Sequence, residues 1–63
     1  MKVRDLIRLI ESRGWCIART RGDHRQYRHP TQPGVVTVSG HPGNDVMKKT
    51  LASVLRQAGL KGR

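Results

Sequence analysis

The segment Arg19-Thr-Arg-Gly-Asp-His-Arg-Gln-Tyr-Arg-His-Pro30 holds two polar runs separated by Gly22 and Asp23. A glycine next to an aspartate between two such runs is typical of a tight hairpin turn, because glycine adopts positive φ without steric cost. We therefore expect two short strands, at residues 15–20 and 24–29. The second strand is polar enough that one of its faces must meet solvent or a ligand.

Side chains alternate between the two faces of a strand. In the second strand this places His24, Gln26 and Arg28 on one face. The other face then carries Arg25, Tyr27 and His29. In the first strand, the same alternation points Trp15, Ile17 and Arg19 one way and Cys16 and Ala18 the other.

Apolar periodicity before the hairpin predicts a helix over residues 3–13. Its apolar side chains recur at the i, i+3, i+4, i+7 spacing of one helix face. They are Val3, Leu6, Ile7 and Ile10. Gly14 follows as a natural stop. No good N-cap residue precedes this helix, so the sequence leaves its start poorly defined.

The chain after the hairpin predicts a third strand and a second helix. Residues 35–38 are all β-branched, which favours a strand. A second helical period begins near residue 47, and we expect Asp45 or a neighbour to start that helix. Its apolar residues are Met47, Leu51, Val54, Leu55 and Ala58. Gly59 and Leu60 have the pattern of a glycine cap with its hydrophobic contact.

These elements predict a small α+β domain spanning residues 1–63, with the order α-β-β-β-α. Three consecutive strands with short links should form an antiparallel sheet. Two helices would cover one face of that sheet and leave the other open. The core should contain Trp15, Ile17 and either Val35 or Val36, with the two helical stripes. We expect Cys16 to be a small core hydrophobe.

Charge is the strongest feature of the composition. The 63 residues include 13 Lys and Arg against 4 Asp and Glu, a net charge of +9. Such a surface attracts polyanions, so the expected partners are nucleic acid or an acidic protein rather than a membrane. No apolar run approaches the length of a membrane span. The single cysteine allows no internal disulfide and suits a reducing cytoplasm.

The titratable residues favour chemistry on RNA without a metal ion or other cofactor. No Cys and His pair has zinc-finger spacing, and the four acids are scattered. RNA supplies its own nucleophile, the 2′-hydroxyl. One imidazole that acts as a base and cationic side chains that stabilise the phosphoryl charge are therefore sufficient for cleavage. His24, beside the turn, is the best general base, and His41 is the second acid or base candidate. Asp23 is a doubtful orienting partner, because in a strand it would face away from His24.

Other residues divide between binding and structural roles. His29 is expected to be structural, whereas Tyr27 could either pack in the core or stack on a base. The hypothesised phosphate contacts are Arg19, Arg21, Arg25, Arg28 and Lys49.

Several motifs, in order along nearly the whole chain, resemble HicA-type (YcfA-like) toxins. They are Gly14-Trp15, the Arg-x-x-Gly-x-His of residues 19–24, Tyr27, His29-Pro30, Val36-Thr37-Val38 and residues 50–60. The resemblance implies a double-stranded-RNA-binding-domain-like fold and an mRNA interferase toxin that a HicB-type antitoxin neutralises. The family's catalytic Gly-Ser-His motif falls on Gly22, Asp23 and His24, with Asp23 in place of the serine.

Two rival functions remain open from the residues. A non-catalytic RNA-binding module would use the same arginines for contact with duplex RNA. A DNA-binding regulator is less well supported, because the two helices are separated by the strands and form no helix-turn-helix.

Overall fold

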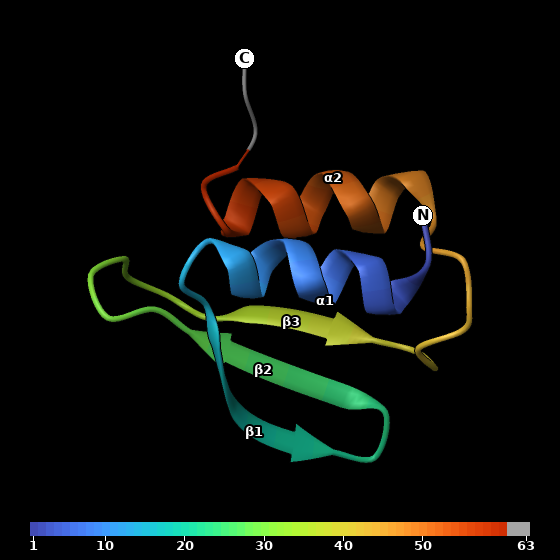
Figure 1. Ribbon diagram of the computed structural model, residues 1–63, viewed down its shortest axis with the longest axis horizontal. Helices are drawn as coiled ribbons and strands as arrows, with labels where there is room; N and C mark the ends of the chain where they lie inside the picture. The colour runs from blue at the N-terminus through green and yellow to red at the C-terminus, as the bar shows by residue number, and fades with distance from the viewer. Residues whose placement is uncertain (61–63) are drawn as a thin grey trace.

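The computed structural model describes residues 1–60. Two helices and a three-stranded antiparallel sheet follow one another in the order α-β-β-β-α, as predicted (Figure 1). The elements are α1 (Val3–Ser12), β1 (Cys16–Arg21), β2 (His24–Arg28), β3 (Val36–Ser39) and α2 (Lys48–Gln57). Sequential neighbours pair in the sheet, so β2 is central and β1 and β3 are its edges. Within residues 1–60, neither helix is long and apolar enough to cross a membrane.

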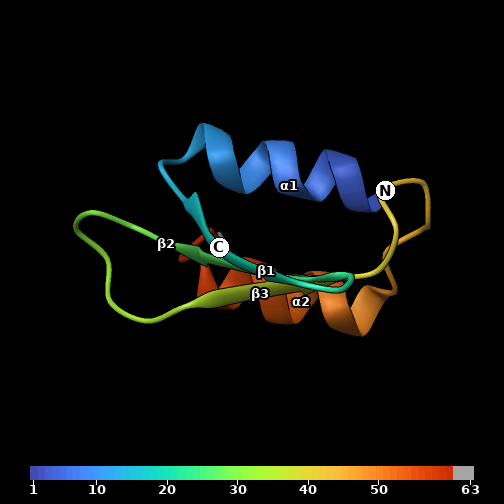
Figure 2. The same cartoon turned by 90° about the horizontal axis from the view of Figure 1, so that it is seen from below.

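A single core lies between the helices and one face of the sheet. The buried side chains are Val3, Leu6, Ile10, Trp15, Tyr27, Val36, Val38, Val54 and Ala58. The strand members of this set share one face, because Tyr27 pairs with Val36 and Val38 lies two residues further along β3. Figure 2 shows α1 on one side of the strands and α2 behind β3, and both helices contact β3. The opposite face carries exposed residues such as Gln26 and Thr37.

Glycine ends both helices by the predicted cap. At the end of α1, Gly14 has a φ of 98° and donates its N–H to the carbonyl of Glu11. The next N–H, from Trp15, bonds to the carbonyl of Ile10. These two bonds satisfy carbonyls that the helix leaves without partners. Gly59 and Leu60 repeat the same pair of bonds at the end of α2.

The start of α1 is fixed by a distant loop. Helices begin with N–H groups that have no partner within the helix. Here Val3 donates to the carbonyl of Asn44 at 2.9 Å, and Arg4 donates to that of Pro42 at 3.1 Å. Lys2 Nζ also lies 3.0 Å from Asp45 Oδ1, and this hydrogen bond lowers the pKa of the Asp45 carboxyl. Asp45 therefore secures α1, whereas α2 begins at Lys48 with Met47 as its N-cap, two residues beyond Asp45.

Three expected core residues are exposed. Cys16 is exposed, and Ile17 is 50% exposed. Met47 lies just before α2 and is 72% exposed. Both strand residues belong to β1, in which all six residues are exposed. Both helices contact β3, and Figure 1 shows β1 at the opposite margin of the sheet, away from both helices. Alternation within β1 could not indicate this position. Of the two valines considered, Val36 is the buried one.

Candidate nucleic-acid interface

A bulge in β1 determines which side chains share the open face. Ile17 pairs with Tyr27, but the next paired residue is Arg19, opposite Gln26. Ala18 is therefore an extra residue, and such a bulge moves the following side chains to the other face. Arg19 leaves the face of Ile17, where strict alternation had placed it. It joins the open face instead.

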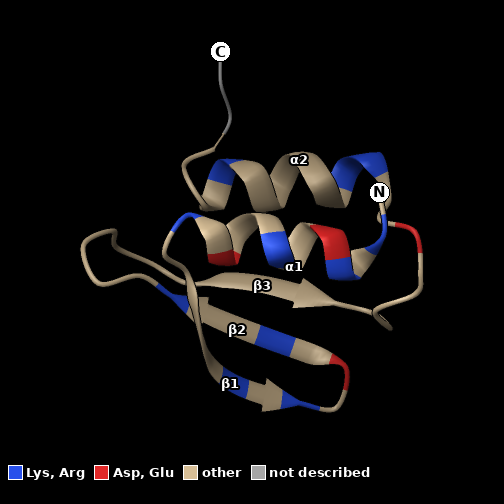
Figure 3. Ribbon diagram, in the orientation of Figure 1, with Lys and Arg blue, Asp and Glu red and all other residues tan. Residues whose placement is uncertain are grey.

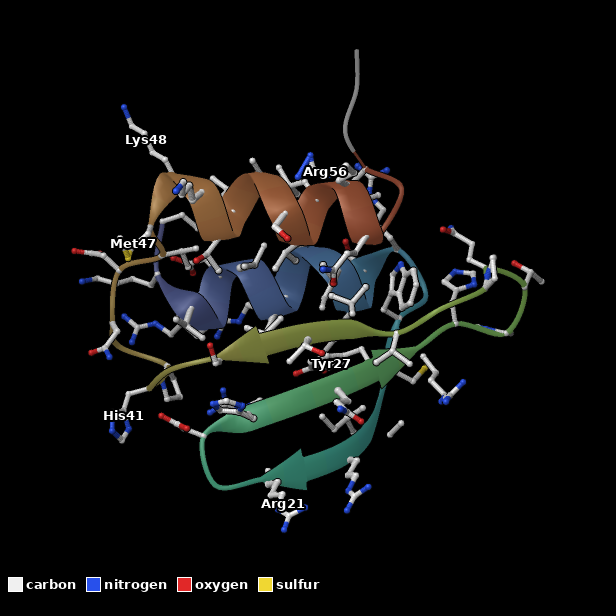
Figure 4. The ribbon with its side chains drawn as sticks, turned by 180° about the vertical axis from the view of Figure 1, so that it is seen from behind. Arg21, Tyr27, His41, Met47, Lys48 and Arg56 are labelled. Atoms are coloured by element: carbon white, nitrogen blue, oxygen red, sulfur yellow. The ribbon has the colours of Figure 1, made fainter. Side chains whose placement is uncertain are left out.

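The open face contains a shallow hollow of about 160 Å³ near the β1–β2 turn. The hollow is lined by Arg19, Arg21, His24, Gln26 and Thr37. These residues come from all three strands, because Arg21 pairs with His24 and Gln26 pairs with both Arg19 and Thr37. Figure 4 shows Arg21 projecting from β1 at the outer edge of the sheet, far from Lys48 on α2.

His24 presents an accessible imidazole in this hollow. Its side chain is 66% exposed, and its Nε2 lies 3.7 Å from Oδ1 of Asp23, whose side chain is 52% exposed. That separation is too long for a hydrogen bond but short enough for electrostatic attraction to a protonated ring. Asp23 belongs to the turn rather than to β2, so strand alternation does not hold its side chain away from His24. The expectation that Asp23 faces away is wrong.

The two arginines of the hollow are not engaged by acids. Within residues 1–60, carboxylates approach basic groups at only two places, Lys2 with Asp45 and His24 with Asp23. Figure 3 shows basic residues along the β1–β2 hairpin and an acidic one at its turn. The guanidinium groups of Arg19 and Arg21 are therefore available to a phosphate, which they can grip with two parallel hydrogen bonds.

Arg25 lies on the opposite face of β2 and has a different set of contacts. Its half-buried side chain donates from Nη1 to the carbonyl of Gly40 at 2.9 Å and to that of Asp23 at 3.4 Å. The N–H of Gly40 bonds to the same Asp23 carbonyl at 3.1 Å. Arg25 thus ties the β1–β2 turn, immediately before His24, to the loop that follows β3.

Three further predicted residues lie outside the hollow. Arg28 shares the open face but is four residues from His24, or about 13 Å along an extended strand. Lys49 is exposed in the first turn of α2, and His41 is exposed in the loop after β3. Figure 4 shows His41 beyond the end of the sheet. The structure therefore groups Arg19, Arg21 and His24, and it separates the other proposed contacts from them.

His29 and Tyr27 have structural positions. The His29 Nδ1 accepts hydrogen bonds from the N–H groups of Thr31 and Gln32, so its Nε2 carries the proton and donates to the carbonyl of Arg13 at 2.9 Å. The expected structural role of His29 is confirmed. Tyr27 is only 2% exposed, and burial raises the pKa of its hydroxyl, with Glu11 adding to the effect. Its ring belongs to the core and cannot stack on a base.

Sequence reasoning missed two residues of the hollow. Gln26 shares a face with His24 by simple alternation, so the pattern contained that signal. Thr37 was not foreseeable, because it reaches the hollow only through its pairing with Gln26 across β2 and β3. Among residues 1–60, no three His, Cys, Asp or Glu side chains gather as metal ligands would.

A known protein family matches this chain over most of its length. A family model described as the HicA toxin of bacterial toxin–antitoxin systems matches residues 3–60. The chain belongs to the HicA toxin family. The match includes all five helices and strands of the described residues. No curated protein matches the chain. This HicA family member is the toxin of a toxin–antitoxin pair, and its natural partner is an antitoxin.

Proposed function

We propose that this toxin is an endoribonuclease that cleaves mRNA in the hollow around His24, without a metal ion. The observation that carries the proposal is an exposed imidazole beside two guanidinium groups that have no acidic partner within residues 1–60. An mRNA substrate would place its action in the cytoplasm. Neutralisation by a HicB-type antitoxin belongs to the same proposal, since covering a basic site suits an acidic protein.

His24 acts as the general base in this mechanism. It removes the proton of a ribose 2′-hydroxyl, and the freed oxygen attacks the adjacent phosphorus. The bond from phosphorus to the 5′-oxygen breaks, and that oxygen takes a proton from solvent. The products are a 2′,3′-cyclic phosphate and a 5′-hydroxyl. The carboxylate of Asp23, with Oδ1 3.7 Å from Nε2 of His24, stabilises the imidazolium that forms.

Arg19 and Arg21 supply the electrostatic part of the reaction. Negative charge builds on the phosphoryl oxygens as the 2′-oxygen attacks, and fixed cations next to those oxygens lower the barrier. Both side chains lie on the same face as His24 and line the same hollow. DNA lacks the 2′-hydroxyl, so it should bind to this surface without being cut.

The direct test incubates purified toxin with a defined RNA in excess chelator. We expect fragments with a 2′,3′-cyclic phosphate and a 5′-hydroxyl, identified by mass spectrometry. The same RNA with 2′-O-methyl groups is the matched control and should remain intact, because its nucleophile is blocked. RNA that is bound tightly but never cut would contradict the proposal and favour a non-catalytic binding module.

Arg25 allows a sharper test of the geometry. We expect Arg25→Ala to lower kcat about tenfold with little change in KM, because the turn immediately before His24 loses its tie to Gly40. Arg25→Lys should recover part of the loss, since an ammonium can still donate to one carbonyl. The measurement is steady-state cleavage of a short RNA, with Arg19→Ala as the comparison, for which we expect both a higher KM and a lower kcat, because Arg19 binds the phosphate and also stabilises the charge that builds on it. A higher KM at unchanged kcat for Arg25→Ala would instead indicate a direct phosphate contact.

A further inference from the structure

The outer edge of β1 is the least protected part of the sheet. β1 pairs only with β2, and all six of its residues are exposed. The other edge strand, β3, alternates buried and exposed residues and has α2 packed beside it. Figure 1 shows β1 at the outer margin of the molecule, away from both helices. Its outward backbone N–H and C=O groups are a template for another strand.

We propose that an acidic, extended segment of the antitoxin adds to the sheet as a fourth strand along β1. This inference rests on the toxin–antitoxin pairing and extends the proposed neutralisation by naming where the antitoxin is held. Main-chain hydrogen bonds would supply the affinity, and alternate side-chain contacts the specificity. The binding surface consists of the backbone edge of residues 16–21 together with Ile17, Arg19 and Arg21.

The side chains of β1 specify what the added strand should carry. Ile17 is 50% exposed and, by the register, lies on the same face as Tyr27. Arg19 and Arg21 lie on the other face because of the bulge at Ala18. Residues directly opposite on neighbouring strands have Cβ atoms about 5 Å apart. The added strand should therefore present an apolar residue to Ile17 and carboxylates to Arg19 and Arg21.

Such a strand would also explain inhibition. Carboxylates paired with Arg19 and Arg21 would occupy the two guanidinium groups that line the His24 hollow, and RNA phosphates could no longer bind there. The antitoxin would thus compete with RNA by charge as well as by bulk.

Two other occupants fit the edge less well. A second copy of this chain, which carries a net charge of +9, would bring the arginines of the two β1 strands together, and like charges on paired strands repel. RNA would bind the guanidinium groups from the open face and leave Ile17 and the backbone edge facing water. Only an acidic polypeptide satisfies the backbone, the isoleucine and the arginines at once.

Hydrogen exchange of the co-purified toxin–antitoxin complex tests this inference. Compared with toxin alone, we expect the outward-facing amides of residues 16–21 to exchange at least tenfold more slowly in the complex, because only these N–H groups gain partners. Unchanged exchange along β1, with protection elsewhere, would overturn the proposal. Protection that appears in toxin alone as its concentration rises would also overturn it, in favour of self-association. Neither readout depends on RNA cleavage, so an inactive enzyme would contradict the proposed function only.

A matched pair of variants provides a second measurement. Ile17→Lys should raise the Kd for the purified antitoxin at least tenfold, while its thermal unfolding and its RNA cleavage stay close to those of the original chain. Met47→Lys is the control, because Met47 is also apolar and 72% exposed but lies before α2. Equal effects of the two changes on Kd would contradict a specific role for the β1 edge.

Discussion

Replacing His24 with alanine should reduce RNA cleavage by about 10²–10⁴-fold, the usual contribution of a positioned general base. The fold should be unaffected, because the side chain is 66% exposed and is not a member of the hydrophobic core. RNA affinity should also change little, since Arg19 and Arg21 remain. The measurement is single-turnover cleavage of a labelled RNA, with affinity determined separately on the 2′-O-methyl form of the same RNA.

His41→Ala is the matched control for this prediction. His41 is also an exposed histidine, but it lies in the loop after β3 and does not line the hollow. We expect its cleavage rate to stay within about threefold of the original, since solvent can protonate the leaving oxygen. If His24→Ala retained its activity while His41→Ala lost it, the assignment of the base to His24 would be wrong.

Trp15→Ala should have the largest effect on stability, about 3–5 kcal/mol of unfolding free energy. Trp15 is 1% exposed, and its Nε1 donates to the carbonyl of Ala58 at 3.3 Å. Its ring also meets that of His29 edge to face, with centroids 5.2 Å apart. One side chain thus joins the ends of both helices to the sheet. A domain of this size is marginally stable, so the variant should be largely unfolded near 37 °C.

Urea and thermal unfolding followed by circular dichroism measure this loss. A change of 1 kcal/mol moves the Tm of so small a domain by about 4–8 °C, so the shift should be at least about 12 °C. Ile17→Ala is the comparison, because Ile17 is 50% exposed and should cost less than about 1 kcal/mol. Equal losses for the two variants would contradict the central position of Trp15.

The hairpin at Gly22 was predictable because its signals are local. A glycine with a φ of 60° between two polar strands requires only neighbouring residues to define it, and the glycine caps at Gly14 and Gly59 are local in the same sense. By contrast, the start of α1 depends on carbonyls of residues 42 and 44, about 40 positions away in the chain. No pattern within the helix could indicate that contact.

The candidate site was predictable only in part. His24 and its arginine-rich surroundings follow from residue type and position beside a turn. Arg25 has the same residue type as Arg19 but turns to the other face, where it binds the Gly40 carbonyl. Residue type alone cannot distinguish these two roles, because a guanidinium suits both phosphates and backbone carbonyls.

The sequence by itself determined the order of the elements, the glycine caps after both helices, the turn and the excess of positive charge, since each depends on spacing or composition along the chain. Only the tertiary structure decided that Ala18 bulges, that Arg19 consequently faces the same side as His24, and that Thr37 completes the hollow. These features depend on the register between strands, which arises from contacts across the sheet rather than from neighbours in the chain.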